Sequence, residues 1–388
     1  MTIYRDRFRG CLLGGATGDA LGAPVENMSR AGILERFGPS GITRYAEAHG
    51  GRGRITAATQ MSLFTAEGLL RAWVRGCLEG HASVPEVTLR AYLRWLHTQR
   101  ETTARHSAGA AQLPAGDGWL IQQAALHSRR SPGSTCLAAL EEMRPGMLDD
   151  SPDEHGPRGT HGLPPDLTAP NNSKGPCALV RNAPIGLFMW LPRVRQTPQH
   201  AFQLGVDLAA LTHGHPTGQL AAGALAALVL LLADGRPPGE ALAETRRLVE
   251  RYPRHTETLH AIEQAEILAG SELPHARALE ELGGGQAAEE VLAIAIYCVL
   301  AGKSFAEVIL LAVNHDGNSQ ATGAVAGNLA GARYGMAAIP ADWLAPLELR
   351  AVICEIADDI YNYRTWDLGA DARKPELAAM VVSKYPGR

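Results

Sequence analysis

The chain of 388 residues contains 36 Lys and Arg against 40 Asp and Glu, a formal net charge of −4 at pH 7. Its basic residues are spread along the whole length, so we expect no basic nucleic-acid patch. Hydrophobic residues make up 46% and aromatic residues only 5%, which favours a large core built from Ala, Leu, Val and Ile.

Apolar residues recur at every third or fourth position along most of the chain, the spacing of one helix face. Period-two alternation is almost absent, so we predict an all-α fold in which residues 1–388 form a single compact domain with long functional loops. Residues 100–118 and 144–174 are expected to be irregular. In chain order, the expected helices are Arg7–Leu21, Ser62–Glu79, Pro85–Gln99, Trp119–Ser128, Ala183–Leu191, Pro198–Leu211, Gln219–Asp234, Pro238–Arg251, Ala288–Leu300 and Ser304–Asn314.

The most apolar segment, Gln219–Gly235, is rich in Ala and ends in Asp-Gly. We interpret it as a buried core helix rather than a membrane span. The first ten residues, MTIYRDRFRG, lack the apolar stretch of a signal peptide. The six cysteines are scattered without a CxxC pair, which favours reduced thiols and a cytoplasmic location.

The first polar cluster, GGATGDALGAPVEN, covers Gly14–Asn27. Small residues at this spacing let a helix pack tightly or let a ligand approach the backbone. Asp19 fits a helix cap or backbone acceptor at least as well as a catalytic acid. Glu26 has no evident structural role, and a structural and a pocket-facing position remain equally open for it.

The second cluster is GRGRITAATQMSLFTAEGLL, Gly51–Leu70, a polar turn that runs into an amphipathic helix. Thr56 to Thr59 read Thr-Ala-Ala-Thr and stand where the free helix amides meet an anion or a metal-bound group. Two alanines therefore present bare methyl groups at a position suited to polar chemistry.

The third cluster, NNSKGPCALVRNAPIG, begins at Asn171 and precedes an apolar helix. Its Asn, Ser, Lys and Gly residues fit either a helix N-cap or a phosphate cradle. The turn LTHGHPTG adds His213 and His215 between two helices, where structural and functional roles are both open.

The fourth cluster, Asn314–Gly335, is a polar loop followed by a helix in which Gly323, Gly327 and Gly331 recur every four residues. Such a stripe allows a second helix to approach very closely. The side chains of residues 318 to 320 should therefore lie at a helix N-terminus near the middle of the core.

These clusters, in this order, resemble the ADP-ribosylglycohydrolase family, in particular its dinitrogenase-reductase-activating glycohydrolase-like members. The resemblance implies an all-α fold and, in active members, release of ADP-ribose from a modified side chain with two Mg²⁺ ions. The segments that carry it are RFRGCLLGGATGDALGAPVE, TQMSLFTAEGLLRA, GWLIQQAALHSRRSPGSTCLAAL, NNSKG with RNAPIGLF, THGHP, EEVLAIAIYCVL and AVNHDG with GAVAGNLAGA.

The chain departs from the family at the metal motifs. Thr-Ala-Ala-Thr replaces Thr-Asp-Asp-Thr, and Gly-Asn-Ser-Gln-Ala replaces Gly-Asp-Ser/Thr-Asp-Ser/Thr. Of seven positions that match metal ligands, Glu26 and Thr56 keep the ligand type. Because Mg²⁺ requires anionic oxygens, we predict that the two ancestral Mg²⁺ ions and any other cofactor are absent. The degenerate positions are Thr56, Ala57, Ala58, Asn318, Gln320 and Ala321.

The remaining loop residues imply a ligand site. By resemblance, Asn172, Ser173, Lys174 and Gly175 line the diphosphate and adenosine side and His213 the ribose side, Asp117 contacts the modified residue, and Asn318, Ser319 and Gln320 complete the pocket. We therefore expect recognition of ADP-ribose or an ADP-ribosylated macromolecule with little or no metal-dependent hydrolysis. Two alternatives stay open: a metal-independent ADP-ribosyl hydrolase that uses Glu26, and an inhibitor of an ADP-ribosyltransferase that contacts its partner through Arg144–Lys174.

Overall fold

The computed structural model describes residues 2–100, 117–143, 167–191, 197–369 and 371–387. Within these ranges the chain forms α-helices and short 3₁₀ turns, and its β pairing is confined to isolated bridges. The first elements are α1 (Ile3–Gly22), η1 (Ala23–Val25), α2 (Arg30–Phe37), α3 (Ala57–Glu79), α4 (Val84–Arg100), η2 (Leu120–Gln122), η3 (Ala124–Leu126), α5 (Ser134–Glu142), α6 (Cys177–Val180), α7 (Ala183–Met189) and α8 (Thr197–Ala210).

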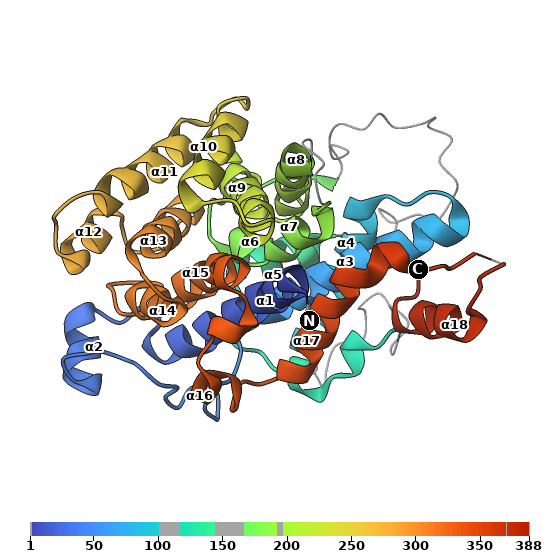
Figure 1. Ribbon diagram of the computed structural model, residues 1–388, viewed down its shortest axis with the longest axis horizontal. Coiled ribbons are helices and arrows are strands. Elements are labelled where there is room, and N and C mark those ends of the chain that lie inside the picture. The colour runs from blue at the N-terminus through green and yellow to red at the C-terminus, as the bar shows by residue number, and fades with distance from the viewer. Residues whose placement is uncertain (1, 101–116, 144–166, 192–196, 370, 388) are drawn as a thin grey trace.

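The second group of elements begins with the long apolar helix α9, which lies beside α8 and α10 (Figure 1). The remaining bounds are α9 (Pro216–Ala233), α10 (Pro238–Val249), α11 (Thr256–Ala269), α12 (His275–Glu281), α13 (Ala288–Ala301), α14 (Phe305–Val313), α15 (Ser319–Tyr334), η6 (Met336–Ala338), α16 (Ala341–Leu344), α17 (Arg350–Asn362), η7 (Tyr363–Thr365) and α18 (Pro375–Lys384). The all-α prediction is confirmed for this part of the chain.

Helices α1 and α15 come from distant parts of the chain and lie side by side at the centre of the molecule (Figure 1). Their glycines face each other in antiparallel register. A β-carbon at Gly14 would lie 2.3 Å from the carbonyl oxygen of Gly327, and one at Gly18 would lie 1.9 Å from that of Gly323. The two backbones are therefore in direct contact, which residues with side chains would prevent. This register brings the N-terminus of α15 to the C-terminal half of α1.

Helix α9 has the length and hydropathy of a membrane span, with a mean hydropathy of 1.7, but 89% of it is buried inside the protein. It packs against α7, α8, α10, α13 and α15. Burial on all sides accounts for its uniformly apolar sequence, because such a helix has no solvent-facing side. The interpretation as a core helix agrees with this packing.

The expected helix Trp119–Ser128 is wrong, because the chain forms η2 and η3 with Gln123 extended between them. In this segment, side chains rather than backbone amides donate hydrogen bonds to two of the carbonyl oxygens. Gln123 donates to the Trp119 carbonyl oxygen, and the Gln60 side chain donates to that of Ser128. Leu120, Ile121 and Leu126 are still buried, so tertiary burial overrides the helical pattern.

Several helices have no counterpart among the expected elements, among them α2, α5, α11, α12, α16, α17 and α18. Helix α11, for example, carries a mixed polar sequence and buries only a few residues such as Ile262 and Ala265. Because its apolar stripe is weak, the spacing of apolar residues did not predict this helix. Most of the two expected irregular loops, residues 101–116 and 144–166, lies outside the described residues.

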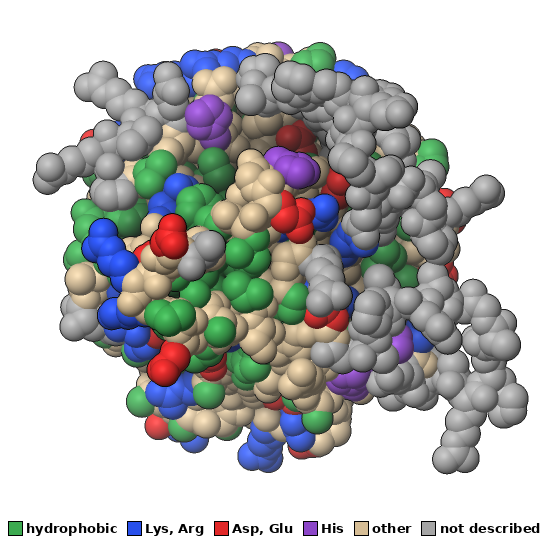
Figure 2. Space-filling model, turned by 90° about the vertical axis from the view of Figure 1, so that its right-hand side faces the viewer, with side chains coloured by type: hydrophobic (Ala, Val, Ile, Leu, Met, Phe, Trp, Pro, Cys, Tyr) green, Lys and Arg blue, Asp and Glu red, His purple; other side chains and the backbone are tan. Residues whose placement is uncertain are grey.

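Acidic and basic side chains are interspersed over the face shown in Figure 2. Ion pairs recur among the described residues: Lys384 lies 2.6 Å from Asp359, and Arg5 lies 2.7 Å from Asp358. The charge on the visible, described part of this face is therefore locally balanced rather than gathered into one strong field.

The glycine contact between α1 and α15 predicts a large cost for Gly18→Ala. The added methyl group would collide with the Gly323 backbone, which cannot rotate away, so we expect the free energy of unfolding to fall by about 3 kcal/mol. Gly76→Ala in α3 is the matched control, because its nearest neighbouring atom would be 4.0 Å away. That control should gain about 0.5–1 kcal/mol from helix propensity. Urea unfolding followed by circular dichroism measures both, and equal midpoints for Gly18→Ala and wild type would contradict the packing.

Candidate functional site

A cavity of about 320 Å³ lies where the N-terminal ends of α3, α6 and α15 meet. Its volume is within the range of small-molecule pockets, about 300–1,000 Å³. The walls come from segments far apart in the sequence and are mostly apolar or neutral. The lining residues are Glu26, Ala57, Ala58, Met61, Ser131, Pro132, Gly133, Pro176, Cys177, Val180, Asn318, Gln320 and Ala321.

Asp19 holds the polar ends of α3 and α15 together behind this cavity. Its carboxylate, which is fully buried on α1, accepts hydrogen bonds from the backbone and hydroxyl of Thr56 at 2.9 and 2.7 Å. It accepts two more from Thr59 and one from the Gln320 amide at 3.1 Å. Burial raises the pKa of Asp19, and these donated hydrogen bonds oppose that rise. Of the two interpretations left open for Asp19, the geometry matches the helix cap.

The Thr-Ala-Ala-Thr turn uses its polar atoms within the protein. Thr56 is the N-cap of α3, and its hydroxyl accepts from the amide of Ala58 at 3.2 Å. The Gln320 side-chain amide also donates to that hydroxyl, at 2.7 Å. The methyl groups of Ala57 and Ala58 complete this wall, each residue being 5% exposed. This end of the cavity is therefore an apolar surface backed by a satisfied polar network.

Glu26 supplies the carboxylate of the cavity. It follows η1, and Ser131 donates a hydrogen bond to its Oε2 at 2.9 Å. Burial raises the pKa of Glu26, while the Ser131 hydrogen bond lowers it. Asn27 and Ser131 both adopt the left-handed backbone region, with φ of 58° and 47°. Such strained positions are uncommon and often occur where a side chain must be held for function.

The donor set of this cavity does not fit two Mg²⁺ ions. Magnesium is held by carboxylates and waters in octahedral geometry, and two dications side by side need several anions. The lining residues provide one carboxylate, from Glu26. Gln320 directs its amide N–H groups toward Asp19 and Thr56, and the Asn318 side-chain oxygen accepts from the amide of Ala321. Neutral amides and methyl groups occupy the remaining wall.

The loop expected to hold a diphosphate is largely bonded to the protein itself. The Ser173 hydroxyl pairs with Thr135 at 3.0 Å and accepts from the amide of Gly175. The Lys174 ammonium is bound by Glu257 and Glu289 at 3.0 and 2.5 Å. Asn172 is exposed at the start of this loop.

The N-cap interpretation of the Asn171–Gly175 loop is wrong. Pro176 is the N-cap residue of α6, and no side chain caps that helix. The loop is instead stabilised by Asn171, whose side-chain oxygen accepts from the amides of Ser173 and Gly214. These residues adjoin the cavity through Pro176 but do not line it.

Three further predicted residues lie away from the cavity wall. His213 is fully buried, and burial together with Arg181 lowers its pKa to about 3, so its imidazole is neutral. Asp117 accepts a hydrogen bond from Arg71 at 3.2 Å. Ser319 is fully buried, whereas its neighbours Asn318 and Gln320 do line the cavity.

His215 is part of the turn that precedes α9. Its Nδ1 accepts from the amide of Thr217 at 3.2 Å and so caps the helix. Between the two roles left open for this residue, the contact supports the structural one.

Residues 131–133 form part of the cavity wall, although no sequence pattern indicated this. Ser131, Pro132 and Gly133 line the cavity, and Ser131 contacts Glu26 directly. The sequence signal was a Ser-Pro-Gly turn, which marks an irregular connection but not its neighbours in space.

Comparison with known proteins agrees with this architecture. The model of the ADP-ribosylglycohydrolase family matches residues 1–369. This chain belongs to the ADP-ribosylglycohydrolase family. It is 24% identical over 350 residues to the ADP-ribosyl-[dinitrogen reductase] glycohydrolase of Rhodospirillum rubrum, covering 89% of this chain and 91% of that protein.

Two other family relatives extend the comparison. The chain is 28% identical over 367 residues to an uncharacterized protein of Archaeoglobus fulgidus, covering 92% of this chain and 96% of that one. It is 24% identical over 360 residues to the ADP-ribosylarginine hydrolase Tri1 of Pseudomonas putida, covering 92% of this chain and 78% of the relative. A solved structure titled ADP-ribosylglycohydrolase-related protein complex superposes with a TM-score of 0.58 at 26% identity, covering 94% and 99% of the two chains.

Removal of the Asp19 carboxylate should disconnect α3 and α15. Asp19→Ala would leave the buried donors of Thr56 and Thr59 without an acceptor, so we expect a loss of about 3 kcal/mol in unfolding free energy. Asp207→Ala is the control, because Asp207 is half-buried on α8 and accepts from Gln203 at 2.8 Å. The control should cost about 1 kcal/mol or less. Thermal unfolding compares them, and equal losses would show that Asp19 has no special role.

Proposed function

We propose that this protein recognises ADP-ribose, or an ADP-ribosylated macromolecule, in the cavity beside Glu26, with little or no metal-dependent hydrolysis. Two relatives are named for the release of ADP-ribose, one from dinitrogen reductase and one from arginine. Their likeness to this chain supports the ligand class. The observation that carries the proposal is a cavity whose wall includes Ala57, Ala58 and the amide side chains of Asn318 and Gln320.

The walls of the cavity suit a sugar better than a free diphosphate. The carboxylate of Glu26, the hydroxyl of Ser131 and the amide of Asn318 supply the polar groups that orient ribose hydroxyls. Met61 and Val180 provide apolar contact area on the same cavity. A diphosphate, in contrast, would compete with two carboxylates for Lys174. We therefore expect modest affinity that depends on shape and hydrogen bonds rather than on charge.

Isothermal titration calorimetry with ADP-ribose tests this recognition. We expect heat of binding that is unchanged by EDTA, because no bound cation takes part. Ala58→Leu should abolish the signal by filling the cavity, whereas Ala269→Leu, at the partly exposed end of α11, should leave it unchanged. Absence of binding at millimolar ADP-ribose, or complete loss of binding in EDTA, would contradict the proposal.

A second function, metal-independent release of ADP-ribose, is favoured by the state of Glu26. Desolvation raises the pKa of this carboxyl group, and a carboxylic acid with a raised pKa can protonate a leaving group near neutral pH. A carboxylate in the same place stabilises the oxocarbenium-like transition state of glycosidic cleavage. This chemistry needs only residues that line the cavity.

The pH dependence of hydrolysis in EDTA tests this second function. If Glu26 acts as general acid, the rate is highest below its raised pKa and falls as the pH rises through it. Glu26→Gln should lower the rate by about 100-fold or more. Ser131→Ala removes a hydrogen bond that lowers this pKa, so its profile should shift to higher pH. An equal rate for Glu26→Gln would eliminate the mechanism.

The third expectation, inhibition of an ADP-ribosyltransferase, relies on a loop of which residues 144–166 lie outside the described residues. No described contact favours it.

A further inference from the structure

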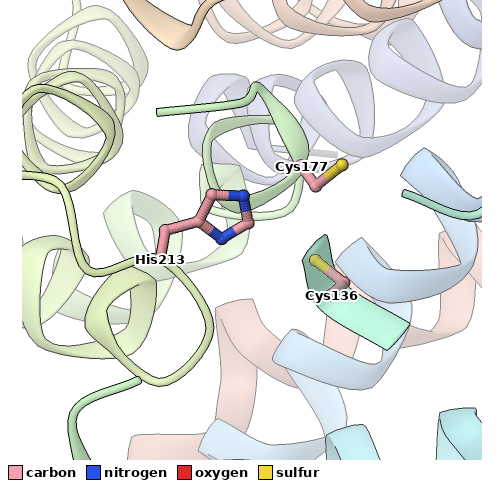
Figure 3. Close-up of side chains that lie close together, drawn as sticks. All are labelled: Cys136, Cys177 and His213. Atoms are coloured by element: carbon pink, nitrogen blue, oxygen red, sulfur yellow. The ribbon is translucent and has the colours of Figure 1, made fainter. Parts of the chain in front are cut away.

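Two thiols and an imidazole converge behind the cavity wall (Figure 3). Cys136 lies on α5, Cys177 is the first residue of α6, and His213 belongs to the turn between α8 and α9. One ligand atom from each, the two sulfurs and an imidazole nitrogen, lies within 4.8 Å of the others. These residues are separate from the metal motifs discussed above, which come from α3, α15 and Glu26.

His213 has one ring nitrogen without a partner. Its Nδ1 lies 2.9 Å from the hydroxyl of Thr212, but its Nε2 has no hydrogen-bond partner although the residue is completely buried. An unsatisfied buried polar atom of this kind costs about 1–3 kcal/mol. Metal-ligating histidines have the same arrangement, with one nitrogen fixed by a neighbour and the other free for the ion.

The hydrogen bonds around Thr212 determine which nitrogen is available. Arg181, which can only donate, gives a hydrogen bond to the Thr212 hydroxyl at 2.8 Å and another to the Cys136 sulfur at 3.2 Å. As a thiol, Cys136 donates toward that hydroxyl at 3.9 Å. As the thiolate that binds a cation, its sulfur can only accept, so the Thr212 proton then faces it. The second lone pair of the hydroxyl then accepts the Nδ1 proton of His213. The Nε2 lone pair is left free.

We propose that Cys136, Cys177 and His213 bind a thiophilic d¹⁰ cation, Zn²⁺ or Cu(I). Thiolate and imidazole are the ligands that such ions select. Zn–S bonds of about 2.3 Å place tetrahedral sulfur ligands about 3.8 Å apart, so these side chains need to close by about 1 Å at most. The site supplies three protein ligands and leaves one position of a tetrahedral ion open.

Arg181 fits this site as a neighbour of the ligands. It is fully buried, stacks over the Tyr92 ring at 4.3 Å, and donates to the sulfur of Cys136. Two thiolates neutralise Zn²⁺, so the guanidinium leaves a charge of +1 that an anionic fourth ligand would cancel. Two thiolates with Cu(I) and Arg181 are already neutral. With Cu(I), the Arg181 guanidinium therefore compensates the charge of the second thiolate. With Zn²⁺, the same guanidinium favours an anion as the fourth ligand.

The position of Cys177 links this site to the cavity. Its sulfur lies so close to the 131–133 turn that a β-carbon at Gly133 would be 1.9 Å away, and Cys177 itself lines the cavity. A bound ion would join α5, α6 and the His213 turn. The proposal does not depend on ADP-ribose recognition, because ion binding is measured without that ligand.

Titration of the reduced, metal-free protein with Zn²⁺, Co²⁺ or Cu(I) tests the site. We expect one Zn²⁺ or one Cu(I) per chain by mass spectrometry of the metal after gel filtration. With Co²⁺ as probe, thiolate-to-metal charge-transfer absorption in the near-ultraviolet should appear. Cys136→Ser, Cys177→Ser and His213→Gln should each lose the ion. Cys298→Ser, at a buried free thiol on α13, should retain it.

Circular dichroism of each variant separates loss of the ligand from loss of the fold. A folded Cys136→Ser or His213→Gln variant that still binds the ion with wild-type affinity would overturn the proposal. The proposal would also be overturned if fully reduced wild-type protein bound neither Zn²⁺ nor Cu(I). The same holds for protein that is isolated with a disulfide between Cys136 and Cys177 and then fully reduced. Uptake of Cu(I) alone, lost in the same three variants, supports the site and identifies the ion.

Discussion

The backbone contact between α1 and α15 is the constraint on which the candidate site depends. Glycines at matching positions of both helices leave no side chain between them at these points, so the helices meet there at their backbones. That approach places Asp19 of α1 next to Gln320 at the start of α15 and beside the N-terminus of α3. Without this close approach of α1 and α15, the starts of α3 and α15 would not both bind the Asp19 carboxylate, and the cavity wall that they form would not be held together.

The shared carboxylate also stabilises the polar groups behind the cavity wall. Asp19 accepts hydrogen bonds from Thr56, Thr59 and Gln320, so its carboxylate is satisfied inside the protein and does not face the cavity. Gln320 completes this network from the start of α15. Ala57 and Ala58 then cover it with methyl groups. The result is a cavity with one carboxyl group on its wall, Glu26, whose pKa is raised by burial.

The sequence predicted a structural feature correctly where the residue type itself determines the role of the residue. The glycine stripe on α15 and the small residues of α1 indicated close packing, and Glu26 stood out because nothing local explained it. Prediction failed where neighbours in space decide the role. The Trp119–Ser128 pattern is helical, yet side chains such as Gln60 satisfy its backbone. A phosphate-binding loop was one interpretation of the sequence around Lys174, but carboxylates from α11 and α13 bind the Lys174 ammonium group.

The sequence by itself determined the helical class and the family, because periodicity, motif order and residue identity are local properties of the chain. Only the tertiary structure decided which glycine faces which, that Asp19 accepts hydrogen bonds from the start of α3, and that Ser131 lies beside Glu26. It also brought Cys136, Cys177 and His213 together from three separate elements. Such contacts depend on packing between residues up to about 300 positions apart, and the spacing of residues along the chain carries no record of them.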